Sequence, residues 1–73
     1  MTQKEFLKIF NLLQLNYDKK MPDEIIRLWY NEFKDVKKDI FEKAIIQTIR
    51  YDYNFPTMNS VSERVADFNR RVF

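Results

Sequence analysis

Hydrophobic residues recur at spacings of three and four along most of the chain, the period of a helix with one buried face. The first such segment begins at Thr2, which lies three residues before Glu5. That spacing matches a capping box, in which the hydroxyl and the carboxylate each bind a free backbone N–H at the start of a helix. The expected inner face consists of Phe6, Ile9, Phe10, Leu13 and Tyr17, broadened by Leu7, Leu12 and Leu15.

The second helical segment follows a polar break over residues 16–21. Pro22 favours a helix start, and Asp23 and Glu24 suit the positive end of the helix dipole. Trp29 is expected at the centre of the core, because it stands at helical spacing from other large apolar residues. The expected inner side consists of Ile25, Leu28, Trp29, Glu32 and Phe33, with Ile26 and Tyr30 lying partly round from it.

A third helix is predicted after the charged turn over residues 34–38. Ile40 and Ile46 lie off its main apolar stripe, so this helix is expected to be covered on more than one side. The expected inner face consists of Phe41, Ala44, Ile45, Thr48 and Ile49.

The segment over residues 50–57 ends the third helix, because Pro56 disfavours helical geometry at the residue before it. Thr57 or Asn59 is expected to cap the last helix. The apolar face of that helix consists of Met58, Val61, Val65, Phe68 and Val72, and its other side carries Glu63, Arg64, Asp67, Arg70 and Arg71. Strand-like alternation is not sustained anywhere, so the sequence predicts an all-α fold, a compact bundle of four helices forming one domain over residues 1–73.

The composition limits the chemistry available to this chain. It contains no His, no Cys and no Gly, so the commonest zinc ligands, proton shuttles and phosphate-binding loops are missing. The acid pairs Asp23/Glu24, Asp35/Asp39 and Glu63/Asp67 stand among Lys and Arg on polar helix faces, where solvated surface is the ordinary explanation. We therefore expect no enzyme activity, no cofactor, no metal and no small-molecule substrate.

Charge and hydropathy favour a soluble intracellular protein. The net charge is only +2, with seven basic and five acidic residues in 37–73, which is well short of a nucleic-acid-binding composition. No apolar run approaches the length of a membrane span, and the N-terminus lacks a signal-peptide pattern. A function in binding another macromolecule remains.

Three aromatic residues and three arginines are the features that such binding would use. Tyr51, Tyr53 and Phe55 alternate with polar residues, as in some single-strand nucleic-acid binders, although rings that plug the end of the bundle are the favoured explanation. The last helix carries Arg64, Arg70 and Arg71 and suggests an alternative function as a helix-turn-helix DNA-binding domain. The long connection before it, without Gly, argues against that motif. Self-association through the last helix is a third hypothesis.

The order of several short motifs resembles a known family. Asp23-Glu24-x-Ile26-x-x-Trp29-Tyr30-x-x-Phe33-Lys34-Asp35 is followed by Ala44-Ile45 and then by Phe55-Pro56-Thr57. This pattern, from Phe6 to Val65, is similar to the N-terminal domain of phage-encoded replicative-helicase loader/inhibitor proteins. Trp29, Phe33, Ala44, Pro56 and Thr57 correspond to the family's scaffold.

The resemblance implies a non-catalytic adaptor in phage DNA replication, working in the host bacterial cytoplasm. Its implied partners are the replicative helicase and an origin-binding replisome organiser. Members of the family are longer, so the chain is expected to be the folded N-terminal part of a longer protein. For the partner-binding residues we predict Ile26, Tyr30, Arg64, Arg70, Arg71 and Phe73.

Overall fold

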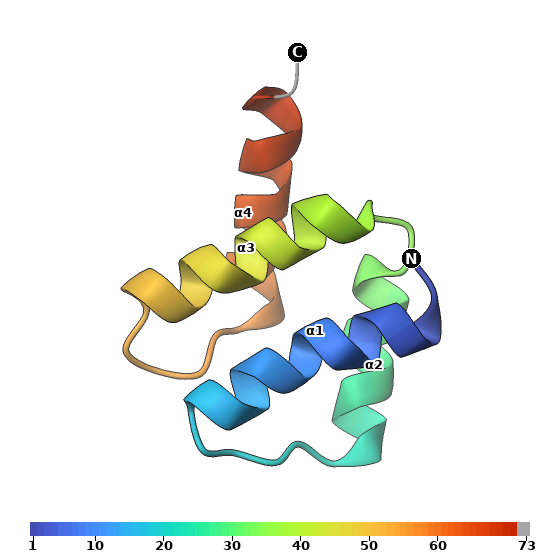
Figure 1. Ribbon diagram of the computed structural model, residues 1–73, viewed down its shortest axis with the longest axis vertical. Helices are drawn as coiled ribbons and strands as arrows, with labels where there is room; N and C mark the ends of the chain where they lie inside the picture. The colour runs from blue at the N-terminus through green and yellow to red at the C-terminus, as the bar shows by residue number, and fades with distance from the viewer. Residues whose placement is uncertain (72–73) are drawn as a thin grey trace.

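The computed structural model describes residues 1–71 of the chain and contains four α-helices in that range. They are α1 (Gln3–Asn16), α2 (Asp23–Phe33), α3 (Lys38–Tyr51) and α4 (Met58–Arg71). Figure 1 shows α1 and α3 side by side, with α2 and α4 crossing behind them. α3 packs against both α1 and α4, and α2 packs against α4. The predicted all-α architecture of four helices is confirmed.

Both ends of α1 are held by local hydrogen bonds. The backbone N–H of Thr2 donates to the Glu5 carboxylate at 2.8 Å, and the backbone N–H of Glu5 donates to the Thr2 hydroxyl at 3.1 Å. This confirms the capping box. The N–H of Thr2 also stabilises the charged form of Glu5 and lowers the pKa of its carboxyl. At the other end, Asp18 takes a left-handed conformation with φ of 51°.

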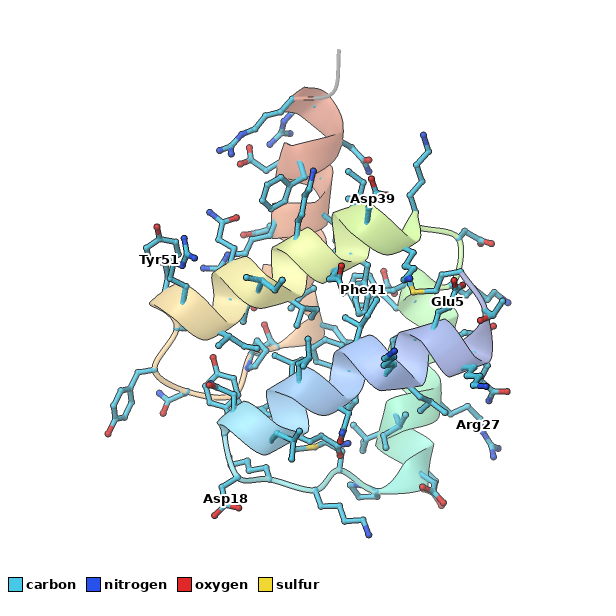
Figure 2. All side chains as sticks on the ribbon, in the orientation of Figure 1. Glu5, Asp18, Arg27, Asp39, Phe41 and Tyr51 are labelled. Carbon is cyan, nitrogen blue, oxygen red and sulfur yellow. The ribbon has the colours of Figure 1, made fainter. Side chains whose placement is uncertain are left out.

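The core is one cluster of buried side chains contributed by all four helices. Trp29 is 4% exposed and lies against Phe10, with ring centroids 5.2 Å apart, which confirms its predicted central position. Phe41 lies between α1 and α3, where its ring is 5.5 Å from that of Phe6 (Figure 2). Burying a side chain of this size contributes about 1.5–3 kcal/mol, so a few aromatic rings supply much of the stability.

The inner face of α2 differs from the sequence prediction. Ile25 and Leu28 were expected inside but are 38% and 54% exposed. Ile26 and Tyr30 pack against the core instead, and the ring of Tyr30 meets that of Phe6 at 5.3 Å. The reason is the crossing of α2 under α1, which turns the side next to Trp29 inward and leaves Ile25 and Leu28 in solvent.

The inner face of α1 is narrower than the sequence prediction. Leu7, Leu12 and Leu15 do not broaden it, since they are 45%, 38% and 71% exposed. In a chain this small, few elements are available to cover the sides of a helix, so only its central stripe is fully buried.

α3 is the most enclosed helix. Phe41, Ala44, Ile45 and Thr48 are all buried as predicted, and Ile49 is partly buried. Ile40 is 4% exposed, which confirms that a second side of α3 is covered. Ile46, expected to belong to such a covered side, is 45% exposed and faces away from the core.

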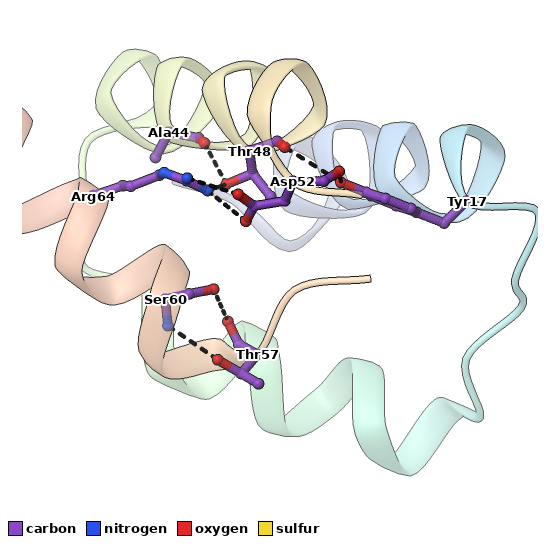
Figure 3. Close-up of polar contacts among 7 residues, drawn as sticks. All are labelled: Tyr17, Ala44, Thr48, Asp52, Thr57, Ser60 and Arg64. Atoms are coloured by element: carbon purple, nitrogen blue, oxygen red, sulfur yellow. Dashed lines mark hydrogen bonds and ion pairs between the residues drawn. The ribbon is translucent and has the colours of Figure 1, made fainter. Parts of the chain in front are cut away.

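The connection before α4 is fixed at its end and open in its middle. The Thr57 hydroxyl accepts a hydrogen bond from the backbone N–H of Ser60 at 3.1 Å, which identifies Thr57 as the cap (Figure 3). Phe55 packs against the core, as predicted. Tyr51 and Tyr53 do not plug the bundle, since they are 67% and 95% exposed. Val61 and Val65 are buried on α4, whereas Val72 lies outside the described residues.

Candidate partner-binding surface

A polar network around Arg64 links α3, α4 and the connection between them (Figure 3). The guanidinium of Arg64 donates two hydrogen bonds to the Asp52 carboxylate, at 2.8 and 2.9 Å, in a paired geometry. A third bond from Arg64, also 2.8 Å, reaches the hydroxyl of buried Thr48. Thr48 in turn donates to the backbone carbonyl of Ala44 at 2.9 Å.

The same network reaches the end of α1 through Tyr17. Its hydroxyl donates to the backbone carbonyl of Asp52 at 2.8 Å. Arg64 lowers the pKa of the Asp52 carboxyl through these hydrogen bonds, and Asp52 raises the pKa of the Arg64 guanidinium. The pKa of the Tyr17 phenol is raised, first by burial and then by the charge of Asp52. Arg64 therefore acts as a structural residue of the fold.

Two fixed points hold the connection between α3 and α4, and one exposed aromatic stands between them. Asp52 is bound to Arg64, and the ring of Phe55 lies 5.7 Å from that of Tyr17 and 6.2 Å from that of Trp29. Between these anchors, Tyr53 is 95% exposed. The fold thus presents this ring to solvent on a segment that is held on both sides.

A shallow groove lies between the outer side of α3 and the C-terminal half of α4. We call it the α3–α4 groove, and its volume is about 320 Å³. Figure 2 shows Tyr51 at the outer end of α3, pointing away from the bundle. The groove is lined by Lys43, Ile46, Gln47, Arg50, Tyr51, Phe68 and Arg71.

The lining of this groove combines an apolar floor with a basic rim. Ile46 and Phe68 supply the apolar surface, while Lys43 and Arg50 stand exposed at the side of α3. Arg71 lies over the ring of Phe68, with its guanidinium carbon 5.5 Å from the centroid. Within residues 1–71, no acidic side chain lines the groove.

Asp67 holds the two arginines at the end of α4. It accepts a bond from Arg70 at 3.2 Å and one from Arg71 at 2.9 Å. Both arginines remain mostly exposed, at 74% and 64% of their side-chain surface. An ion pair this exposed contributes little to stability, so its charges remain available to a partner.

A second hollow, of about 330 Å³, lies between α1 and the start of α3. Its apolar part comes from Ile9 and Leu12. Three lysines line it together with two acids, Glu5 and Glu42, so its charges are closer to balance than those of the α3–α4 groove. Its lysines are Lys4, Lys8 and Lys38.

The structure brings together only some of the residues predicted to bind a partner. Arg70 and Arg71 share the last turn of α4, which projects beyond α3 in Figure 1. Arg64 is turned inward to Asp52. Ile26 and Tyr30 are partly buried against the core on α2, and Phe73 lies outside the described residues.

The α3 side of the groove was missed in the sequence. Its signal was the spacing of Lys43, Ile46, Gln47, Arg50 and Tyr51, which places all five on one side of a helix. Ile46 was noticed there only as a residue off the main stripe.

Other kinds of site were also considered. Among residues 1–71, no group of three acidic side chains lies close enough to hold a metal ion. Within the same part of the chain, no helix has the length and apolar character needed to cross a membrane.

Comparison with known proteins identifies the family. A model of the N-terminal domain of the gene 39 protein of phage SPP1, a helicase loader/inhibitor, matches residues 1–62. No curated protein and no solved structure matched the chain significantly. Proteins of this family take part in phage DNA replication, where they bind the host replicative helicase and the replisome organiser and have no catalytic activity of their own. The match extends over most of the chain and confirms the resemblance seen in the sequence: this protein belongs to the gene 39 protein family of phage helicase loader/inhibitor proteins.

Proposed function

We propose that this chain binds the replicative helicase of the phage's host, with the origin-binding replisome organiser as its second partner, in the host bacterial cytoplasm. The observation that carries the proposal is the match of the family's N-terminal domain to residues 1–62. Because the family acts without catalysis, the mechanism is occupancy: the adaptor covers part of the helicase and so controls when the helicase engages DNA.

A few exposed side chains provide most of the binding energy in this proposal. Tyr and Arg are the residue types most often found at such anchor positions. Arg70 and Arg71 fit that role because they are exposed at the end of α4. Ile26, Tyr30, Arg64 and Phe73 remain predictions as direct contacts. The internal bonds of Arg64 suggest that it supports the surface and does not touch the partner.

The test is binding of the purified 73-residue chain to immobilised host helicase, and separately to the organiser, measured by biolayer interferometry. We expect saturable binding to at least one of them. The double variant Arg70→Glu, Arg71→Glu should keep its far-UV circular dichroism, because exposed substitutions change stability little. It should bind more weakly.

Failure of the wild-type chain to bind either protein at micromolar concentration would refute the proposal. A gel shift of duplex DNA that disappears steeply as salt rises would favour a DNA-binding domain instead. An unwinding assay with the bound helicase then gives the direction of the effect, since an inhibitor lowers the unwinding rate and a loader raises the amount of helicase on DNA.

A further inference from the structure

The α3–α4 groove combines an apolar floor with an unopposed basic rim. We propose that it binds an acidic amphipathic helix of a partner protein, an assignment that rests on the adaptor function proposed above. The apolar side of the partner helix would cover Ile46 and Phe68, and its carboxylates would meet Lys43, Arg50 and Arg71.

The shape of the groove suits a helix. The α3 residues from Lys43 to Tyr51 span about 12 Å of helix axis, at roughly 1.5 Å per residue, which matches two turns of a partner helix. Phe68 and Arg71 on α4 form the opposite side. Two helices with apolar residues between them are the usual receiving surface when a peptide helix docks in a groove.

The charge of the lining indicates an acidic partner. Among the residues that the structure describes, three cations and no acid line the groove. Asp67, next to it on α4, is engaged by both Arg70 and Arg71, so it offsets only part of this charge. Complementary charge of this kind steers association and excludes basic segments.

The apolar floor indicates a protein partner and not a nucleic acid. Ile46 is 45% exposed, and covering it gains free energy only when apolar groups of the partner exclude water from it. A phosphate backbone would meet the rim and leave this floor wet. Nucleic-acid sites also gather more cations than the three present here.

The groove exists before binding. Thr48 and Ile45, on the inner side of α3, are fully buried, and Arg64 ties α3 to α4 through Thr48 and Asp52. Arg71 lies over the ring of Phe68. A surface that is already ordered loses less conformational entropy on binding.

The experiment follows backbone amide signals of the ¹⁵N-labelled 73-residue chain by NMR. The probe is a helical peptide of about 16 residues with leucines at i, i+3, i+4 and i+7 and glutamates at the other positions. A matched peptide carries lysine in place of glutamate. We expect saturable shifts at Ile46, Gln47, Arg50 and Phe68 with the glutamate peptide, and none with the lysine peptide.

Two double variants locate the site. Lys43→Glu with Arg50→Glu should weaken binding of the glutamate peptide by about tenfold or more, because both cations become repulsive. Lys4→Glu with Lys8→Glu changes the same net charge at the hollow beside α1 and should bind like the wild type. Both variants should keep the wild-type circular dichroism.

Each outcome decides the assignment separately from the proposed function. Absent or non-saturating shifts at the groove, equal binding of the lysine peptide, or equal weakening in the two variants would overturn it. So would a duplex oligonucleotide that shifts the same amides and displaces the peptide. If the groove binds the peptide while the chain binds neither helicase nor organiser, the adaptor function fails and the groove's specificity stands.

Discussion

Arg64 and Asp52 show how one ion pair can fix three segments of a small protein. Arg64 comes from α4 and Asp52 from the residue after α3, and the backbone carbonyl of Asp52 also accepts a bond from Tyr17, beyond α1. The side chains of Arg64 and Asp52 are 25% and 29% exposed, so water screens the pair less than it screens a surface ion pair.

This pair predicts a loss of stability in acid. The pKa of Asp52 is lowered in the folded state, so the charged carboxylate stabilises the fold above its unfolded pKa, and this contribution disappears as pH falls through the folded pKa. We expect Asp52→Asn to lower the free energy of unfolding by about 1–2 kcal/mol near pH 7. The difference from wild type should shrink toward about pH 2, measured by urea denaturation at a series of pH values.

Asp67→Asn is the matched control for this prediction. Its pairs with Arg70 and Arg71 are exposed, so its effect near neutral pH should stay within about 0.5 kcal/mol. If Asp52→Asn differed from wild type by the same amount at every pH, the charge of Asp52 would not be the source of its contribution.

At the scale of the element, α1 ends without the residue that helices most often use. Asp18 is left-handed, with φ of 51°. The N–H of Lys19 donates to the carbonyl of Gln14 at 3.0 Å, and the N–H of Asp18 to that of Leu15 at 3.4 Å. This is the Schellman pattern, in which glycine is usually found at the left-handed position. The aspartate also places a negative charge at the negative end of the helix dipole.

Asp18→Gly should therefore stabilise the protein. Relief of the left-handed conformation and of the unfavourable charge should exceed the entropy that glycine adds to the unfolded chain, for a net gain of about 0.5–1 kcal/mol. Urea denaturation measures it. Asp35→Gly is the control, because Asp35 lies in a turn without a positive φ and should lose a few tenths of a kcal/mol. A loss at Asp18 as well would contradict the argument.

The helices themselves were predictable because their signals are local. The capping box at Thr2, the break before Pro22 and the Thr57 cap depend on residues a few positions apart. The facing of α2 was not predictable in the same way, because Ile25 and Ile26 are both apolar and one step along a helix turns the face by about 100°. The crossing with α1 decides between them, and that is a tertiary fact.

The partner-binding residues were harder still to predict. Arg64 and Arg71 stand seven residues apart on one helix, yet Arg64 turns to Asp52 and Arg71 lies over Phe68. Their difference depends on where α4 passes the end of α3, which no local pattern encodes. Arg70 and Arg71, beyond that crossing, are as exposed as the sequence suggested.

At the scale of the whole molecule, the core joins all four helices around a single tryptophan. Trp29 on α2 contacts Phe10 of α1, at 5.2 Å between ring centroids, and Phe55 from the connection before α4, at 6.2 Å. Phe10 and Phe55 belong to the same cluster as Phe41 of α3 and Val61 of α4. None of these four helices has a core of its own, so loss of one helix should expose the others.

We therefore expect residues 1–73 to unfold as one cooperative unit. Trp29 fluorescence reports packing around α2, whereas far-UV circular dichroism reports helix throughout the chain. In a urea titration the two transitions should coincide, as two-state unfolding requires. Phe55→Ala removes a ring that lies against both Trp29 and Tyr17, and it should move both transitions together to lower urea. A fluorescence transition that precedes the loss of helix, in either protein, would mean that α1 and α2 separate while α3 and α4 stay folded. The groove could then persist without the Trp29 side of the core.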